Sequence, residues 1–128
     1  VNEVINERYP IGLDMGFFSK NDIRMEEDAF IFKSKYFSYE IPYTDIKDVK
    51  LRDDIDLGRM ITGTSGALSH YGNFKNDDYG SYDVIFHVTA KLLIVLEFGE
   101  EKHVVFNMGN VESTKDFYKK LKGKARLL

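Results

Sequence analysis

The stretch LLIVLEFGEEKHVVF, residues 92–106, decides the fold class of this chain. The nearly continuous apolar run from Lys91 to Phe98 predicts a strand that is buried on both faces. Turn-forming residues at 99–101 then predict a hairpin into a second strand that contains Val104 and Phe106. A hairpin this apolar indicates a β-rich core.

Strands are also predicted in the earlier part of the chain, where apolar residues recur at every second position. The acidic run Glu26 to Asp28 reads as a tight turn between two strands, and Pro42 is expected to end a third because it cannot donate to a ladder. The Gly-rich segment 53–80 predicts short strands joined by long, exposed loops. The alternating residues are Ile23 and Met25; Phe30 and Phe32; Phe37, Tyr39 and Ile41; Val49 and Leu51; and Val84, Phe86 and Val88.

The period changes to that of a helix near the C-terminus. Asn110 is the expected N-cap, and Gly123 is the expected end of the helix. Phe117 and Leu121 are expected to plug the open end of the β structure. One face of this helix carries Val111, Thr114, Phe117, Tyr118 and Leu121.

These elements predict a mainly β fold, an antiparallel barrel or sandwich of about seven strands capped by one C-terminal α-helix. We expect an N-terminal extension at 1–21, a domain at 22–122 and a C-terminal tail at 123–128. A chain of 128 residues is long enough to bury one core without disulfides or metal.

Composition narrows the class of partner. The net charge of −3 gives no overall attraction for nucleic acid. The chain has no cysteine, so it has neither a thiolate zinc site nor a Cys nucleophile, which suits a cytoplasmic location. No apolar run approaches the length of about 20 residues that a membrane helix needs.

The order of elements, together with a set of residues in the middle and at the end of the chain, resembles the pleckstrin homology (PH) fold. In particular, the chain resembles a bacterial PH-like domain family of uncharacterised proteins. The resemblance implies a binding or self-assembling module attached to a membrane-associated parent protein, at the inner face of the membrane. Membrane contact would then come only through segments outside this chain. The residues that carry the resemblance are Ile41, Pro42, Tyr43, Asp45, Ile46, Val49, Arg59, Gly63, Gly72, Phe74, Gly80, Tyr82, Asn107, Phe117, Tyr118 and Leu121.

One departure from the family pattern concerns lipid binding. PH domains that bind phosphoinositides hold them with basic residues in the turn between the first two strands. Here that turn is Glu26-Glu27-Asp28, and three carboxylates repel an inositol phosphate. We therefore do not expect a phosphoinositide ligand.

The segment 58–80 is the candidate site for a small ligand or lipid, because it holds the richest mix of hydrogen-bonding groups in the chain. An alternative is that its glycines merely permit tight turns, since no phosphate-cradle spacing is present. The candidate ligand-binding residues are Arg59, His70, Tyr71, Asn73 and Lys75.

Neither metal nor catalytic motifs emerge, so we predict a non-catalytic protein without a cofactor. His87 and His103 lie on strands expected to be close, but no third metal ligand accompanies them. Asp53, Asp54 and Asp56 do not fit a calcium loop. The leading hypothesis is association with another protein or with a second copy, through an exposed strand edge or an aromatic surface. The aromatic residues expected at turns are Tyr36, Tyr43, Tyr79 and Tyr82.

Overall fold

A computed structural model of the protein describes residues 22–33, 37–66, 69–87 and 91–126. The predicted extension at 1–21 lies outside the described residues. Within the described ranges the chain forms nine strands, a short 3-10 turn and one α-helix. In chain order these are β1 (Asp22–Met25), β2 (Ala29–Lys33), β3 (Ser38–Pro42), η2 (Tyr43–Asp45), β4 (Ile46–Arg52), β5 (Arg59–Ser65), β6 (Ser69–Asn76), β7 (Gly80–His87), β8 (Leu93–Phe98), β9 (Lys102–Phe106) and α1 (Val111–Lys124).

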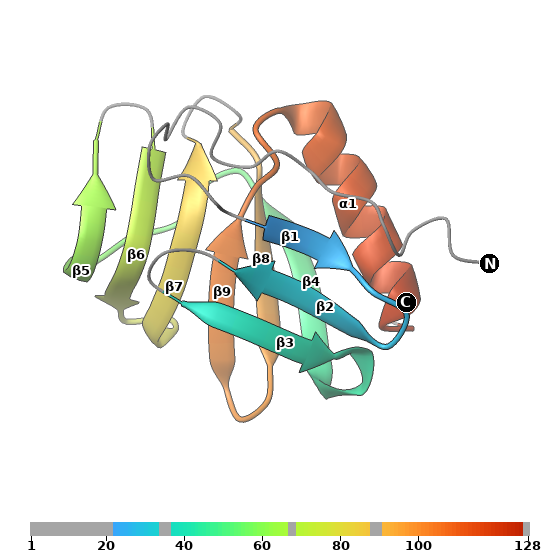
Figure 1. The fold of residues 1–128 in the computed structure, drawn as a ribbon. Coiled ribbons are helices and arrows are strands. Elements are labelled where there is room, and N and C mark those ends of the chain that lie inside the picture. Colours follow the sequence, from blue (N-terminus) through green and yellow to red (C-terminus); the bar gives the residue numbers. More distant parts are fainter. Residues whose placement is uncertain (1–21, 34–36, 67–68, 88–90, 127–128) are drawn as a thin grey trace.

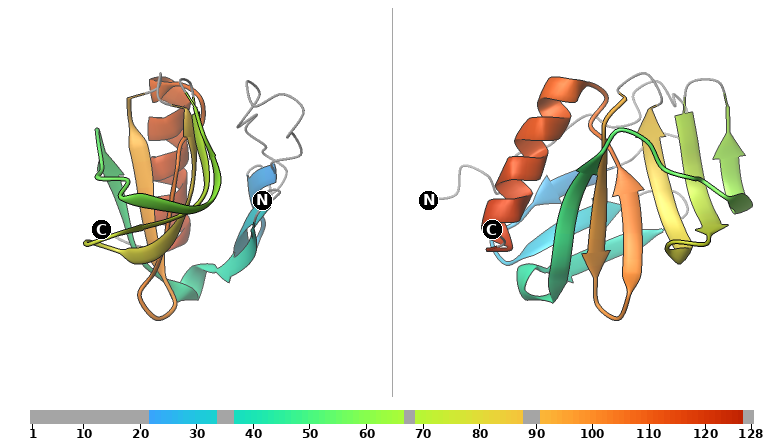
Figure 2. Two further views of the ribbon diagram at one scale, coloured as in Figure 1. Left: turned by 90° about the vertical axis from the view of Figure 1, so that its left-hand side faces the viewer. Right: turned by 180° about the vertical axis from the view of Figure 1, so that it is seen from behind.

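The strands form two sheets that pack face to face, with α1 along one side (Figures 1 and 2). The smaller sheet has the order β1-β2-β3, and the larger has the order β4-β8-β9-β7-β6-β5. The prediction of a mainly β fold with one C-terminal helix is confirmed. Within the described residues the sheets do not close into a barrel. The pairing is antiparallel except between β7 and β9, which run parallel.

The N-terminal meander forms as its alternating pattern predicts. The acidic turn joins β1 to β2, with a hydrogen bond of 2.8 Å from the Glu26 amide to the Ala29 carbonyl. Pro42 ends β3, and the Tyr43 hydroxyl donates a 2.6 Å hydrogen bond to the Glu26 carbonyl. This bond fastens the turn to η2, which leads the chain into the larger sheet.

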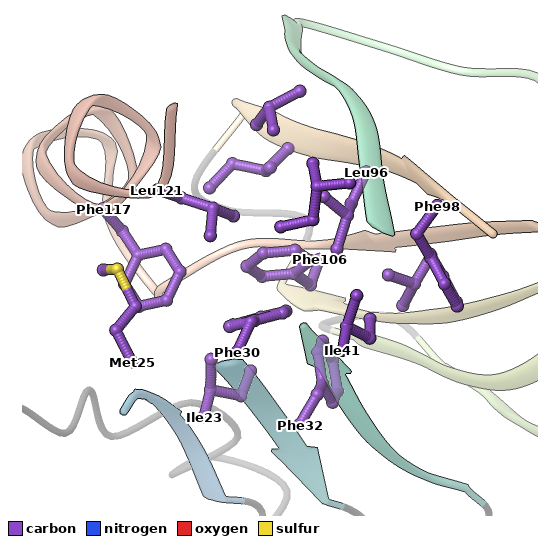
Figure 3. Packing of buried hydrophobic residues seen from close by; sticks show 14 of the residues in the cluster. Ile23, Met25, Phe30, Phe32, Ile41, Leu96, Phe98, Phe106, Phe117 and Leu121 are labelled. Carbon is purple, nitrogen blue, oxygen red and sulfur yellow. The ribbon is translucent and has the colours of Figure 1, made fainter. Parts of the chain in front are cut away.

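The main core lies between the two sheets and the helix, and its centre is a group of three phenylalanine rings (Figure 3). Phe30 of β2 lies 5.7 Å from Phe106 of β9 and 5.8 Å from Phe117 of α1, measured between ring centroids. The rings of Phe106 and Phe117 are 5.9 Å apart. Phe117 and Leu121 are fully buried, so the two predicted plug residues fill the space between the sheets.

The helix begins as predicted but ends later. The Asn110 side chain accepts a 2.8 Å hydrogen bond from the Ser113 amide, and the buried Thr114 hydroxyl donates to the Asn110 carbonyl at 2.6 Å. Gly123 lies inside the helix, which continues to Lys124, so the prediction that Gly123 ends it is wrong. The chain turns out of the helix at Arg126, whose φ of 60° is left-handed.

A second apolar cluster covers the outer face of the larger sheet. Residues 53–58, which we term the strap, run from β4 to β5 across this face (Figure 2). Ile55 and Leu57 pack against buried residues of β6 to β9. The end of the strap is held by the Asn76 side chain, which donates to the Asp56 carbonyl at 2.6 Å, and by the Tyr82 hydroxyl, which donates to the Leu57 carbonyl at 2.8 Å.

The Gly-rich segment forms strands, as predicted, but they are not joined by the long, exposed loops that its composition predicts. Most of it forms β5 and β6, which pair antiparallel. Gly63 lies directly opposite Gly72, and both have a φ of 139°. A Cβ on Gly63 would lie 2.1 Å from the Tyr71 carbonyl oxygen. The glycines therefore allow two strands to approach closely, a role that turn statistics do not reveal.

Candidate functional site

The most exposed regular element of the described chain is β5, the last strand of the larger sheet. Six of its seven residues are exposed and the seventh, Gly63, is half-buried. Met60 and Ile61 are 43% and 50% exposed, which makes them the two most exposed large apolar side chains among the described residues. A strand at the edge of a sheet also presents unpaired N–H and C=O groups, so β5 offers both apolar side chains and backbone hydrogen bonds.

The exposure of β5 follows from its position. The smaller sheet and α1 lie toward the end of the larger sheet that carries β4, and β5, at the other end, projects beyond them (Figures 1 and 2). Its pairing with β6 is irregular between Met60 and Thr62, where the register shifts by a bulge. The glycine pair further along holds the strand close to β6. One edge of β5 is thereby paired, and the other faces outward.

Charge is nearly absent from this edge. β5 carries one charged residue, Arg59, at its first position. Charged side chains within an edge strand discourage pairing with another chain, because pairing would remove their hydration. Residues 60 to 65 have no such protection.

The five candidate ligand-binding residues do not come together. Successive residues of a strand point to opposite faces, and this alternation separates them. Tyr71 is buried in the main core, whereas His70 lies on the outer face beside Phe86, with ring centroids 5.3 Å apart. Asn73 donates hydrogen bonds to the Asp83 carboxylate at 2.9 Å and to the Tyr82 carbonyl at 3.1 Å.

Arg59 and Lys75 are the remaining two, and both are exposed. They lie opposite each other in the β5–β6 pair, where two like charges disfavour rather than strengthen the pairing. Their position at one end of the hairpin is remote from His70, which pairs with Ser65 at the other end. The segment 58–80 thus contributes one of its five candidates, His70, to a cavity.

That cavity lies under the first part of the strap and has a volume of about 250 Å³. Its floor is apolar, and its rim carries charges of both signs. Burial lowers the pKa of His70, whose Nδ1 is hydrogen-bonded to the Ser65 hydroxyl, so the ring is favoured in its neutral form. The lining residues are Asp53, Asp54, Ile55, Leu57, His70, Phe86, Lys91 and Leu93.

A larger groove of about 580 Å³ lies between the acidic turn and the C-terminal end of α1. Glu27 and Asp28 face Lys124 and Arg126 across it. The mixture of signs gives no net attraction for a phosphate group, in agreement with the charge of the turn.

The two strand histidines occupy positions that are well separated along the sheet. Asp83 lies opposite Val104 in the parallel β7–β9 ladder, so His103 is level with residue 82. His87 is five positions further along, about 16 Å away at about 3.3 Å per residue. The His103 ring instead stacks on Tyr79 at 4.5 Å. In the part of the chain that the structure describes, no group of three acidic or histidine side chains is placed to hold a metal ion.

The expected aromatic surface is not formed by the described tyrosines. Tyr43 and Tyr82 are buried, with 9% and 2% exposure, and their hydroxyls are hydrogen-bonded to backbone carbonyls inside the fold. Tyr79 is half-buried against His103. Tyr36 lies outside the described residues. Of the two surfaces predicted for association, the exposed strand edge remains.

A polar cluster connects the two sheets but serves the fold. The Tyr39 hydroxyl of β3 donates to the Asp83 carboxylate of β7, and Asn73 donates to the same carboxylate. Burial, followed by the hydrogen bond and the charge of Asp83, raises the pKa of Tyr39. Tyr39 therefore stays protonated and acts as a donor, which keeps the Asp83 carboxylate paired.

Met60 and Ile61 were not among the residues singled out from the sequence. The signal for them is the short run Met60-Ile61-Thr62, which combines β-branched and apolar residues between Arg59 and Gly63. The surrounding glycines obscure it.

No family model, curated protein or solved structure matches this chain. The resemblance to the bacterial PH-like family therefore stays a prediction. Within the described ranges, no helix has both the length and the apolar character needed to span a bilayer.

Proposed function

We propose that this protein is a non-catalytic association module of the PH-like sandwich type, and that it binds a polypeptide strand along β5. The observation that carries the proposal is the exposed edge of β5, with Met60 and Ile61 in its middle. An added strand would form main-chain hydrogen bonds with this edge and cover both apolar side chains. No covalent step is involved.

The surroundings of β5 support the same proposal. The inner face of β6 and β7 is anchored to the smaller sheet through the Tyr39–Asp83 bond, and the outer face is held by the strap. The edge is therefore presented by a rigid sheet, which reduces the entropy that binding must overcome. By its resemblance to bacterial PH-like domains, the module belongs to a parent protein held at the inner face of the membrane by segments outside this chain.

Site-specific photo-crosslinking in the cells that naturally produce the protein tests the proposal. A benzophenone amino acid at Thr62 should give a discrete protein adduct, whereas the same group at Lys50 of β4 should not. The adduct at Thr62 should disappear when Ile61→Lys is added, because a buried ammonium disfavours strand pairing. Equal adducts at Thr62 and Lys50 would contradict a specific β5 site.

A second candidate function is the binding of a small apolar ligand in the cavity under the strap, and the observation that favours it is the apolar floor beside His70. A ligand that binds the folded state raises the melting temperature. In a metabolite and lipid panel, His70→Ala should abolish any such shift, whereas Arg59→Ala, at the far end of the hairpin, should leave it unchanged. Absence of any shift across the panel counts against this function.

A further inference from the structure

We infer that the strand bound by β5 is the β5 of a second copy of this chain, paired antiparallel about a two-fold axis at Thr62. This inference rests on the proposed function and names its partner. Two-fold symmetry brings the same surface of each subunit together, and two identical edge strands that meet in this way must run antiparallel. The result is one continuous sheet that extends across both copies.

The side chains of β5 fit their own copy in this register. Thr62 pairs with Thr62, and hydroxyl-bearing β-branched residues are favourable partners across strands. Ile61, the residue at the bulge of β5, lies opposite Gly63 of the copy, so a large exposed side chain at an irregular point of the strand meets a position that has no side chain. Met60 lies opposite Thr64.

Charge also permits this pairing. Arg59, the one charge on β5, lies opposite Ser65 of the copy. The two Arg59 residues lie at opposite ends of the ladder, six positions apart, which is about 20 Å at about 3.4 Å per residue. Repulsion between them is then largely screened by salt. A parallel arrangement would instead place the two Arg59 side chains next to each other.

The shape of the molecule leaves room for the copy. The smaller sheet and α1 lie away from β5, and nothing among the described elements stands beyond it in any of the views (Figures 1 and 2). Symmetric pairing uses up both β5 edges, so the assembly closes at two copies. A single strand pair is a small interface, below about 1,200 Å² in total, so we expect a reversible dimer rather than a permanent one.

Single-cysteine crosslinking tests the register, because the chain contains no cysteine of its own. A cysteine at the two-fold axis meets its own copy, whereas one at a strand end does not. The purified Thr62→Cys protein should therefore be linked into a dimer by a short bismaleimide, and the matched control Ser65→Cys should remain monomeric. A mixture of Arg59→Cys and Ser65→Cys proteins should crosslink to each other, because these positions face each other across the axis.

Ile61→Lys in the Thr62→Cys background should reduce the dimer yield at least tenfold, with an unchanged denaturation midpoint showing that the fold is intact. The inference is overturned if folded Thr62→Cys protein is not crosslinked, or if Ser65→Cys crosslinks as well as Thr62→Cys. Loss of crosslinking together with a photo-adduct to another protein at Thr62 in cells would remove the second copy as partner and leave the proposed function standing. Failure of both would remove both.

Discussion

The larger sheet has two edges, β4 and β5, and they differ in almost every respect that governs strand pairing. β4 carries four charged residues, Lys47, Asp48, Lys50 and Arg52, whereas β5 carries one. The helix α1 packs against β4 and lies beside it, but nothing described covers β5 (Figure 1). β4 contributes the buried Ile46 and Val49 to the core, and β5 contributes no buried residue.

Natural proteins protect exposed strand edges with charge, with bulges or with covering elements. One edge of this sheet has the charges and the helix as well as a register shift near Ile46. The other has a bulge between Met60 and Thr62 and one charged residue, Arg59. β4 is therefore protected by charge and by a covering helix, whereas β5 has neither form of protection along residues 60 to 65.

The largest expected effect comes from weakening the packing of α1, the helix that covers β4. Phe117→Ala deletes a fully buried ring that contacts both Phe30 and Phe106, so we expect the free energy of unfolding to fall by about 4 kcal/mol. Urea denaturation followed by circular dichroism measures the change. Tyr118→Ala, on the half-buried side of the same helix, is the matched control and should cost less than half as much. Equal losses would mean that α1 is not held by its plug.

The next test disrupts the close pairing of β5 with β6 at Gly63. Gly63→Val places a Cβ within 2.1 Å of the Tyr71 carbonyl oxygen at a left-handed φ, so we expect a loss of about 3 kcal/mol. The control is Gly66→Ala, since a Cβ there meets no atom within 4 Å. Thermal and urea midpoints of both variants give the answer. If Gly63→Val is as stable as the parent, β5 is not tied to β6 in the way described.

A smaller effect is expected on the β4 side at high pH. Burial and, to a lesser extent, the charge of Asp28 raise the pKa of Tyr43, in η2 just before β4, from 10.0 to about 12. A raised pKa favours the protonated phenol in the folded state. This contribution is complete below pH 10 and is lost as the pH rises from 10 toward 12.

The parent protein should therefore lose about 2 kcal/mol more than Tyr43→Phe between pH 9 and pH 12. Denaturant midpoints at several pH values measure this difference. Because Tyr39 and Tyr82 are present in both proteins, their titration cancels in the comparison. Parallel pH profiles for the two proteins would contradict the assignment to Tyr43.

The smallest expected effect comes from a variant that tests whether β4 is protected by its charged residues or by α1. Lys50→Thr with Arg52→Thr gives β4 a polarity closer to that of β5, and both positions are exposed, so stability should change by less than about 0.5 kcal/mol. If α1 is sufficient cover, light scattering should show no new oligomer. Concentration-dependent association of this variant that persists with Ile61→Lys would show instead that the charges keep β4 closed.

Much of the fold follows from local patterns. The helix and its Asn110 cap, the turn at Glu26 to Asp28 and the hairpin at 99–101 are predicted because their partners are close in sequence. The order of the larger sheet is different, since β4 pairs with β8 and β7 with β9 across intervening strands. Nothing in the period of the apolar residues specifies which distant strand becomes the neighbour.

The candidate site was less accessible to prediction than the fold. Composition predicts a site at the polar residues of the Gly-rich segment. Alternation along β6, however, places Tyr71 in the core and His70 on the outer face. The exposure of Ile61 depends on β5 being the last strand, which is a property of sheet order. The burial of Tyr43 and Tyr82 likewise depends on carbonyl acceptors far away in the sequence.

The parallel contact between β7 and β9 has a consequence for synthesis on the ribosome. β4 and the meander of β5, β6 and β7 emerge before the β8–β9 hairpin that joins them, and α1 follows the hairpin. Until then the nascent meander has two vacant sides, β5 and β7. The late hairpin fills the side with Val84, Ile85 and Phe86, which become buried, and leaves the side with Thr62. The apolar β7 side of the meander is therefore completed by a later part of the same chain, whereas the β5 side is still exposed in the folded chain.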